Sequence, residues 1–63
     1  MISLGQNVRV ASGPHEGRSG TVVQLRDVVL GYSEPEQYAI VEYGVDGGGK
    51  DAVSVPVRRL ERK

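Results

Sequence analysis

The sequence predicts an all-β fold: a small five-stranded barrel with a single 3₁₀ turn before its last strand. Eleven of the 24 apolar residues are valine, and the chain contains neither Phe nor Trp. Nine glycines and three prolines interrupt the chain every few residues. β-Branched residues favour strands, whereas Gly and Pro break long helices. Because 63 residues suffice for only one core, we expect residues 1–63 to form a single domain.

The first two strands are predicted on either side of a glycine-rich loop. Residues 7–11 alternate polar and apolar side chains, which is typical of a strand with one buried face. Residues 12–20 contain three glycines and a proline and are predicted to form a loop that ends at Gly20. Residues 21–25 form the second strand, in which the neighbouring valines Val22 and Val23 indicate a bulge or burial on both faces.

A mobile hairpin loop is predicted over residues 27–36. Gly31, Ser33 and Pro35 mark a turn in this segment. Residues 28–30 are apolar, so an extension of the second strand is the alternative for the first part of the segment.

The second half of the chain is predicted to contain three strands and the 3₁₀ turn. Residues 37–43 contain no breaker and favour a central strand. Residues 46–47 are Asp-Gly, a favoured hairpin pair, and residues 51–55 alternate again. Residues 56–59 begin with proline and predict one helical turn, after which Leu60 anchors a short last strand.

Five short, closely spaced strands of this kind predict a closed barrel of the SH3-like type, because closure removes exposed sheet edges at minimal chain length. An open sheet and an oligonucleotide-binding-fold barrel are the alternatives. We expect Val8, Val10, Ile40 and Val53 to lie in the core.

A family resemblance lies in the first third of the chain. Its glycines and valines are spaced as Gly5, Val8-Arg9-Val10, Gly13-Pro14, Gly17, Gly20 and Val22. This pattern resembles the KOW motif of the SH3-like barrels found in ribosomal and NusG-type proteins. The resemblance implies binding to RNA, or to ribosome and polymerase surfaces, through the loops. Family members that bind RNA usually carry lysines where this loop has His15, Glu16 and Arg18.

A second resemblance involves both ends of the chain. Its residues are Gly5, Val8-Arg9, Ser12-Gly13, Tyr38-Ala39-Ile40-Val41-Glu42 and Val55-Pro56-Val57-Arg58-Arg59-Leu60-Glu61-Arg62. They are similar to the type II dihydrofolate reductases, small SH3-like barrels that work as tetramers around one pore. That family has Val-Gln-Ile-Tyr before the proline, where residues 52–55 here are Ala-Val-Ser-Val, and a lysine where this chain has Val10. We therefore do not transfer the reductase activity.

Catalytic and metal-binding chemistry is not expected. The chain has one histidine and no cysteine, and its carboxylates are scattered, so no metal-ligand spacing is present. A nucleophile at Ser12, Ser19 or Ser54 would need an activating base, and only His15 could serve. We predict no catalytic residue, no metal site and no cofactor, and an enzymatic role is disfavoured.

Charge is balanced overall but divided along the chain. Residues 34–51 hold five acidic side chains and one lysine, a balance of −4, whereas residues 52–63 hold four basic side chains and one glutamate, a balance of +3. A basic face could bind phosphate groups. A solvated surface, or pairing of opposite patches between copies, is the alternative. The candidate nucleic-acid or partner-binding residues are Arg9, His15, Arg18, Tyr38, Arg58, Arg59 and Arg62.

The sequence thus predicts a non-enzymatic binding module that contacts RNA, DNA or a ribonucleoprotein partner through residues 12–19 and the arginine-bearing C-terminal segment. A reductase-like homo-oligomer, active or degenerate, and a protein-interaction or assembly domain are the alternatives. No apolar run approaches the roughly 20 residues of a membrane span, and residues 1–5 lack the features of a signal peptide. We expect a cytoplasmic protein without a membrane partner.

Overall fold

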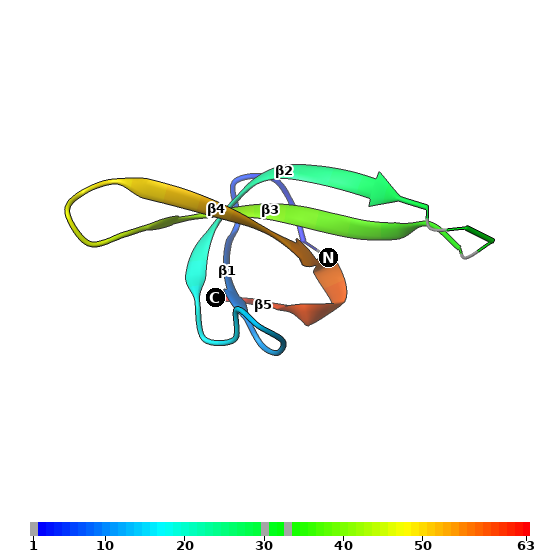
Figure 1. Cartoon of the computed structure of the whole chain (residues 1–63), viewed down its shortest axis with the longest axis horizontal. Helices are drawn as coiled ribbons and strands as arrows, with labels where there is room; N and C mark the ends of the chain where they lie inside the picture. The colour runs from blue at the N-terminus through cyan, green and yellow to red at the C-terminus, as the bar shows by residue number, and fades with distance from the viewer. Residues whose placement is uncertain (1, 30, 33) are drawn as a thin grey trace.

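The computed structural model describes residues 2–29, 31–32 and 34–63. Leu30 and Ser33, which belong to the predicted loop 27–36, lie outside the described residues. The elements are β1 Asn7–Val10, β2 Ser19–Val28, β3 Glu36–Gly44, β4 Lys50–Pro56, the 3₁₀ turn η1 Val57–Arg59, and β5 Leu60–Arg62 (Figure 1). All strands pair antiparallel in one sheet. The prediction of an all-β fold with a 3₁₀ turn before the last strand is confirmed.

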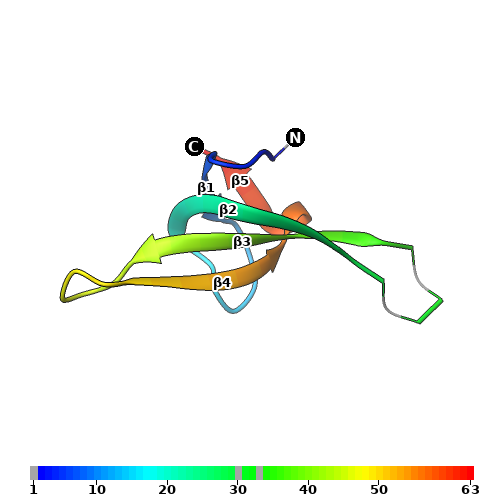
Figure 2. The same cartoon turned by 90° about the horizontal axis from the view of Figure 1, so that it is seen from above.

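The sheet has the strand order β4-β3-β2-β1-β5 and is not closed. β1 and β5 lie on one side of the long ribbon formed by β2, β3 and β4 (Figure 2). Within the described part of the chain, β4 and β5 do not pair with each other, although only η1 separates them in sequence. The predicted closure is therefore not found: β5 has only three residues and pairs with β1 along one edge, and its other edge forms no ladder with β4 in the described residues.

The β2 and β3 strands are longer than the sequence predicts. Asp27 pairs with Gln37 and Val28 with Glu36, so both ends of the predicted loop 27–36 belong to the sheet. The loop prediction was wrong at these ends, because cross-strand backbone hydrogen bonds outweigh the weak strand propensity of the polar residues. The alternative, an extension of the second strand, is confirmed as far as Val28. Two long hairpins project at opposite ends of the molecule, which measures 42 × 20 × 19 Å (Figure 1).

Gly20 lies inside β2 and not at the end of the preceding loop. β2 begins at Ser19, and Gly20 pairs with Val8 of β1. A methyl group on Gly20 would lie 2.3 Å from the Glu42 carbonyl oxygen and 2.8 Å from Val41 Cγ1. The predicted loop boundary was wrong because this glycine is needed for close approach to the β3 backbone rather than for a turn.

A β-bulge interrupts β2 at the position that its neighbouring valines predict. The register against β3 shifts between Val22 and Gln24. Val22 is buried, and Val23 at the irregularity is exposed. The bulge is therefore confirmed, and it lets one of two adjacent apolar side chains leave the core.

The core is small and valine-rich. Val8 and Val10 are buried as predicted, and Val53 is half-buried. Ile40 is also only half-buried, because Ala39 and Val41 on either side of it fill the inner face of β3. Its assignment to the core was wrong. The buried cluster contains Ile2, Val8, Val22, Ala39 and Val41, with Leu25, Val53, Val57 and Leu60 packed against it.

The predicted Asp-Gly turn joins β3 and β4. The Val45 amide donates a hydrogen bond to the Gly49 carbonyl at 3.0 Å, and the Gly48 amide donates to the Val45 carbonyl at 3.3 Å. Gly47 has a φ of +91°, a backbone conformation that side chains with a Cβ disfavour. The hairpin thus depends on glycine at the predicted turn position.

We expect Gly47→Ala to destabilise the protein by about 1–2 kcal/mol, which is the usual cost of placing a Cβ in the left-handed region. The matched control is Gly49→Ala, whose φ is not positive and whose methyl group would make an ordinary 3.4 Å contact with Val45. Urea unfolding measures both variants. Equal midpoints for the two variants would contradict the assigned turn.

Candidate ligand-binding pocket

A pocket of about 210 Å³ lies between the β1–β2 loop, the paired ends of β3 and β4, and η1. It gathers residues from distant parts of the chain. Its lining residues are Val10, Ser12, Pro14, His15, Tyr38, Ser54, Val55, Pro56 and Arg59. We call it the Arg59 pocket.

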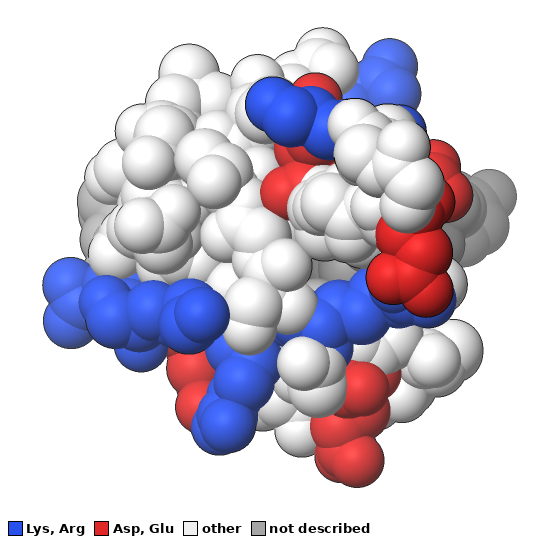
Figure 3. Space-filling view, turned by 90° about the vertical axis from the view of Figure 1, so that its left-hand side faces the viewer, with Lys and Arg blue, Asp and Glu red and all other residues white. Residues whose placement is uncertain are grey.

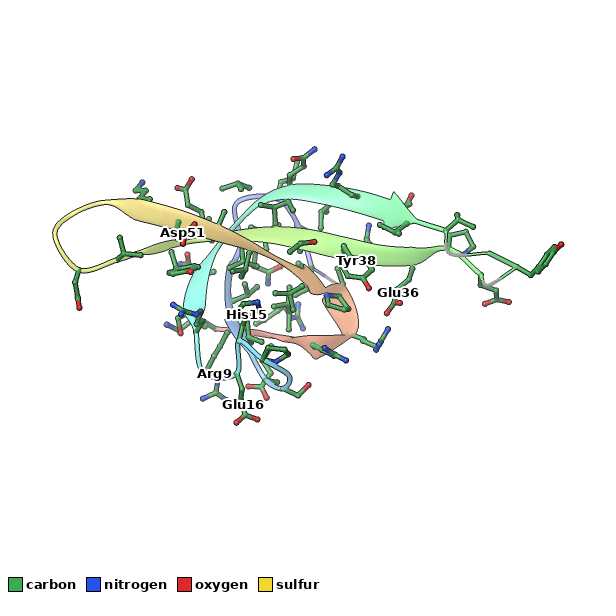
Figure 4. All side chains as sticks on the ribbon, in the orientation of Figure 1. Arg9, His15, Glu16, Glu36, Tyr38 and Asp51 are labelled. Carbon is green, nitrogen blue, oxygen red and sulfur yellow. The ribbon has the colours of Figure 1, made fainter. Side chains whose placement is uncertain are left out.

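The wall formed by β3 and β4 follows from their register. Tyr38 pairs with Pro56 across the two strands, at the point where β4 ends and η1 begins. Pro56 has a φ of −56°, which suits both the strand end and the entry into the turn. The half-buried Tyr38 ring is thereby placed beside Pro56 and close to η1 (Figure 4).

The opposite wall is the β1–β2 loop, which is held by its own backbone hydrogen bonds. The Gly17 amide donates to the Val10 carbonyl at 2.8 Å, and the Val10 amide donates to the Arg18 carbonyl at 2.8 Å. Between these two hydrogen bonds of Val10, the Arg18 amide donates to the His15 carbonyl at 3.1 Å. The loop therefore presents the half-buried His15 from a hydrogen-bonded base.

Arg59 is positioned by contacts of both its backbone and its side chain. The Ala11 amide donates to the Arg59 carbonyl at 2.7 Å, which joins η1 to the end of β1. The Arg59 side chain lies against Gly13, where an added methyl group would come within 2.9 Å of Nη1. The guanidinium is therefore held against the loop at the edge of the pocket.

The polar groups of the pocket suit an anion. Its lining contains one guanidinium, one imidazole, two serine hydroxyls and one phenol, and no aspartate or glutamate. Among the residues that the structure describes, no carboxylate lies within 4.0 Å of the Arg59 guanidinium. An entering phosphate or carboxylate would thus meet hydrogen-bond donors and a positive charge without a competing acid.

Three of the seven predicted binding residues come together in the Arg59 pocket: His15, Tyr38 and Arg59. The other four lie elsewhere. Arg62 is exposed on β5, where it pairs in register with Val8. Arg18 lies over the ring of Tyr43, with its Cζ atom 4.4 Å from the ring centroid.

The remaining two arginines form ion pairs within the chain. Arg9 Nη2 lies 2.6 Å from Glu61 Oε2 on the neighbouring strand β5. Arg58 of η1 pairs with Glu36 at the start of β3. In Figure 4, Glu36 lies near η1 and Tyr38, whereas Arg9 lies beside the β1–β2 loop. Their charges are therefore partly neutralised before any ligand binds.

The end of the molecule from which the β3–β4 hairpin projects carries charges of both signs. Figure 3 shows basic side chains across this face with acidic side chains among them. Lys50 on the hairpin lies 3.4 Å from Glu42. The face is therefore not a uniform basic surface.

Ser54, Val55 and Pro56 are pocket residues that the sequence reasoning missed as part of a site. The information that would identify them is the register of β3 against β4, which places Pro56 opposite Tyr38. An alternating strand shows which side chains share a face but not where its partner strand aligns.

No group of three or more metal-ligating side chains occurs among residues 2–29, 31–32 and 34–63. No helix within these same ranges is long and apolar enough to cross a bilayer. Comparison with known proteins finds no matching family model, no matching curated protein and no matching solved structure.

Proposed function

We propose that this chain is a non-enzymatic binding module that contacts nucleic acid, either free or within a ribonucleoprotein partner, through the Arg59 pocket. The observation that carries the proposal is a guanidinium with no carboxylate within 4.0 Å among the described residues, in a pocket lined by hydroxyls, an imidazole and a phenol. A phosphate diester matches this donor set, since arginine binds phosphate through paired N–H groups.

We also propose that the open five-stranded sheet is a small SH3-like barrel of the KOW type with a gap between β4 and β5. Its support is the 3₁₀ turn that links these two strands and the glycine-bearing loop between β1 and β2. On such a scaffold the loop and the turn form the rim of the gap. The Arg59 pocket is lined by residues of both this loop and this turn.

Arg59→Gln is expected to weaken binding to RNA by about tenfold, because it removes a charge-assisted contact with phosphate. In fluorescence anisotropy over a salt series, the slope of log affinity against log salt should be shallower by about 1 for Arg59→Gln than for the parent protein. Lys50→Gln is the control, because it removes a positive charge that lies outside the pocket and is already paired with Glu42, so its effect on affinity should be smaller. Thermal melting checks that both variants are folded.

Two results of that experiment would overturn the proposal. One is the absence of salt-dependent affinity for either RNA or duplex DNA. The other is an equal loss of affinity in Arg59→Gln and Lys50→Gln, which would show that the pocket has no special role.

A protein-interaction or assembly domain is the second candidate function. In the part of the chain that the structure describes, the outer edges of β4 and β5 are unpaired, and such edges can pair with another strand. Sedimentation distinguishes this candidate, since the average particle mass of a self-associating protein increases with protein concentration. A monomer that binds RNA supports the first candidate.

A further inference from the structure

The size of the Arg59 pocket limits what it can hold. Its volume of about 210 Å³ lies below the range of about 300–1,000 Å³ that is typical of pockets for drug-sized ligands. One unit of a polymer fits such a space better than an extended ligand. The other units of such a polymer must contact the protein surface around the pocket.

The pocket combines a ring and a cation on different walls. Tyr38 belongs to the β3–β4 wall, where it pairs with Pro56. Arg59 lies against Gly13 of the β1–β2 loop. Ser12 belongs to this loop and Ser54 to β4. A ligand that fills this space should therefore have a flat ring beside an anionic group, with hydroxyl or amide groups between them.

Among the residues that the structure describes, Tyr38 is the only tyrosine that lines the pocket. Tyr43 is engaged by Arg18 over its ring, and its hydroxyl donates a hydrogen bond to Asp51 at 3.3 Å. Tyr32 is fully exposed between β2 and β3, far along the sequence from the pocket loop. Grooves for proline-rich peptides are lined by several large aromatic side chains, so a single tyrosine argues against that class of ligand.

We infer that the Arg59 pocket holds one unstacked nucleotide of a single strand, with the base against Tyr38 and the phosphate at the Arg59 guanidinium. This inference rests on the proposed function and specifies its substrate. A base within a duplex is stacked on both faces and cannot enter, whereas a single strand can turn one base outward. Selectivity for single strands follows from the shape of the site.

The first arm of the test compares ligands on the unchanged full-length protein. Adenosine 5′-monophosphate, ribose 5-phosphate and inorganic phosphate are each titrated while amide chemical shifts are recorded by NMR. We expect the mononucleotide to shift the amides of Ser12 and Ser54 at concentrations at least about tenfold lower than ribose 5-phosphate does, because only it carries a stacking base. A single-stranded RNA hexamer should bind at least about tenfold more tightly than the same sequence as a duplex.

The second arm tests the ring itself with hexamer affinity. Tyr38→Leu should lose about tenfold in affinity, whereas Tyr38→Phe keeps the aromatic face and should stay within about twofold of the parent protein. Tyr32→Leu is the matched control, since it removes a fully exposed tyrosine outside the pocket, and it should leave affinity unchanged. If Tyr38→Leu fails to fold, the comparison of ligands on the unchanged protein still decides.

The outcomes separate the two proposals. Equal binding of single-stranded and duplex RNA, or equal shifts with the mononucleotide and ribose 5-phosphate, overturns the nucleotide pocket and leaves nucleic-acid binding standing. Loss of affinity in Tyr32→Leu but not in Tyr38→Leu also overturns it. The nucleotide pocket is also overturned if an acidic peptide displaces the hexamer from Ser12 and Ser54 at a lower concentration than the mononucleotide needs. Absence of binding to every nucleic acid overturns the proposed function as well.

Discussion

Gly20→Ala is expected to destabilise the protein by about 3 kcal/mol or more, which is most of the stability of a chain of this size. The added methyl group would lie 2.3 Å from the Glu42 carbonyl oxygen, which belongs to the backbone of β3 and cannot rotate away like a side chain. Overpacking of this kind typically costs about 1–3 kcal/mol and occasionally more. A core in a chain of this size rarely provides more than about 3–5 kcal/mol of stability. Urea titration followed by circular dichroism measures the loss.

Gly44→Ala is the matched control for this substitution. Gly44 is also a strand glycine without a positive φ, and a methyl group there would meet nothing within 4 Å. Its urea midpoint should equal or slightly exceed that of the parent, because alanine lowers the entropy of the unfolded chain. If Gly20→Ala and Gly44→Ala unfold at the same urea concentration, the close approach of β2 and β3 at Gly20 is wrong.

Val41→Ala is expected to destabilise the protein by about 2–3 kcal/mol, the second-largest effect. Val41 is completely buried in the central cluster, so its truncation loses buried apolar surface and leaves a cavity. Val45→Ala removes the same atoms from a side chain that is 41% exposed and should cost less than about 0.5 kcal/mol. Chemical denaturation of both variants gives the comparison, and similar losses would contradict the inner face assigned to β3.

The double variant Gly20→Ala/Val41→Ala provides a further check on the same contact. Truncating Val41 removes its Cγ1 atom, which would lie 2.8 Å from the new methyl group, but it leaves the carbonyl of Glu42 in place. We therefore expect no rescue of Gly20→Ala. A double variant more stable than Gly20→Ala alone would show that the side chain, and not the backbone, is the obstacle.

Strand positions were the part of the fold that the sequence predicted best. Alternation at Val8 and Val10 predicts β1 with its buried face. The adjacent valines Val22 and Val23 predict a bulge or burial on both faces, and the structure has the bulge. Such patterns are local and need no knowledge of the partner strand. The misplacement of Ile40 has the opposite cause, since a run of apolar residues in a strand does not indicate which alternate set faces inward.

The candidate site was less predictable than the strands. Seven residues were singled out because they are basic, aromatic or in the loop, and these properties do not indicate which charges are already neutralised. Arg9 and Glu61 are 52 positions apart, and only the pairing of β1 with β5 brings them together. Arg58 is likewise joined to Glu36 across the start of β3. Surface ion pairs contribute little to stability, about 0–1 kcal/mol, but they reduce the charge that is free for a ligand.

The sequence by itself determined the all-β class, the one-turn helix after Pro56 and the hairpin at Gly47, because each depends on the conformational preferences of neighbouring residues. Only the tertiary structure decided that the sheet stays open between β4 and β5 and that His15, Tyr38 and Arg59 share a pocket. Strand order and register depend on free-energy differences summed over the whole sheet, and no local pattern contains them.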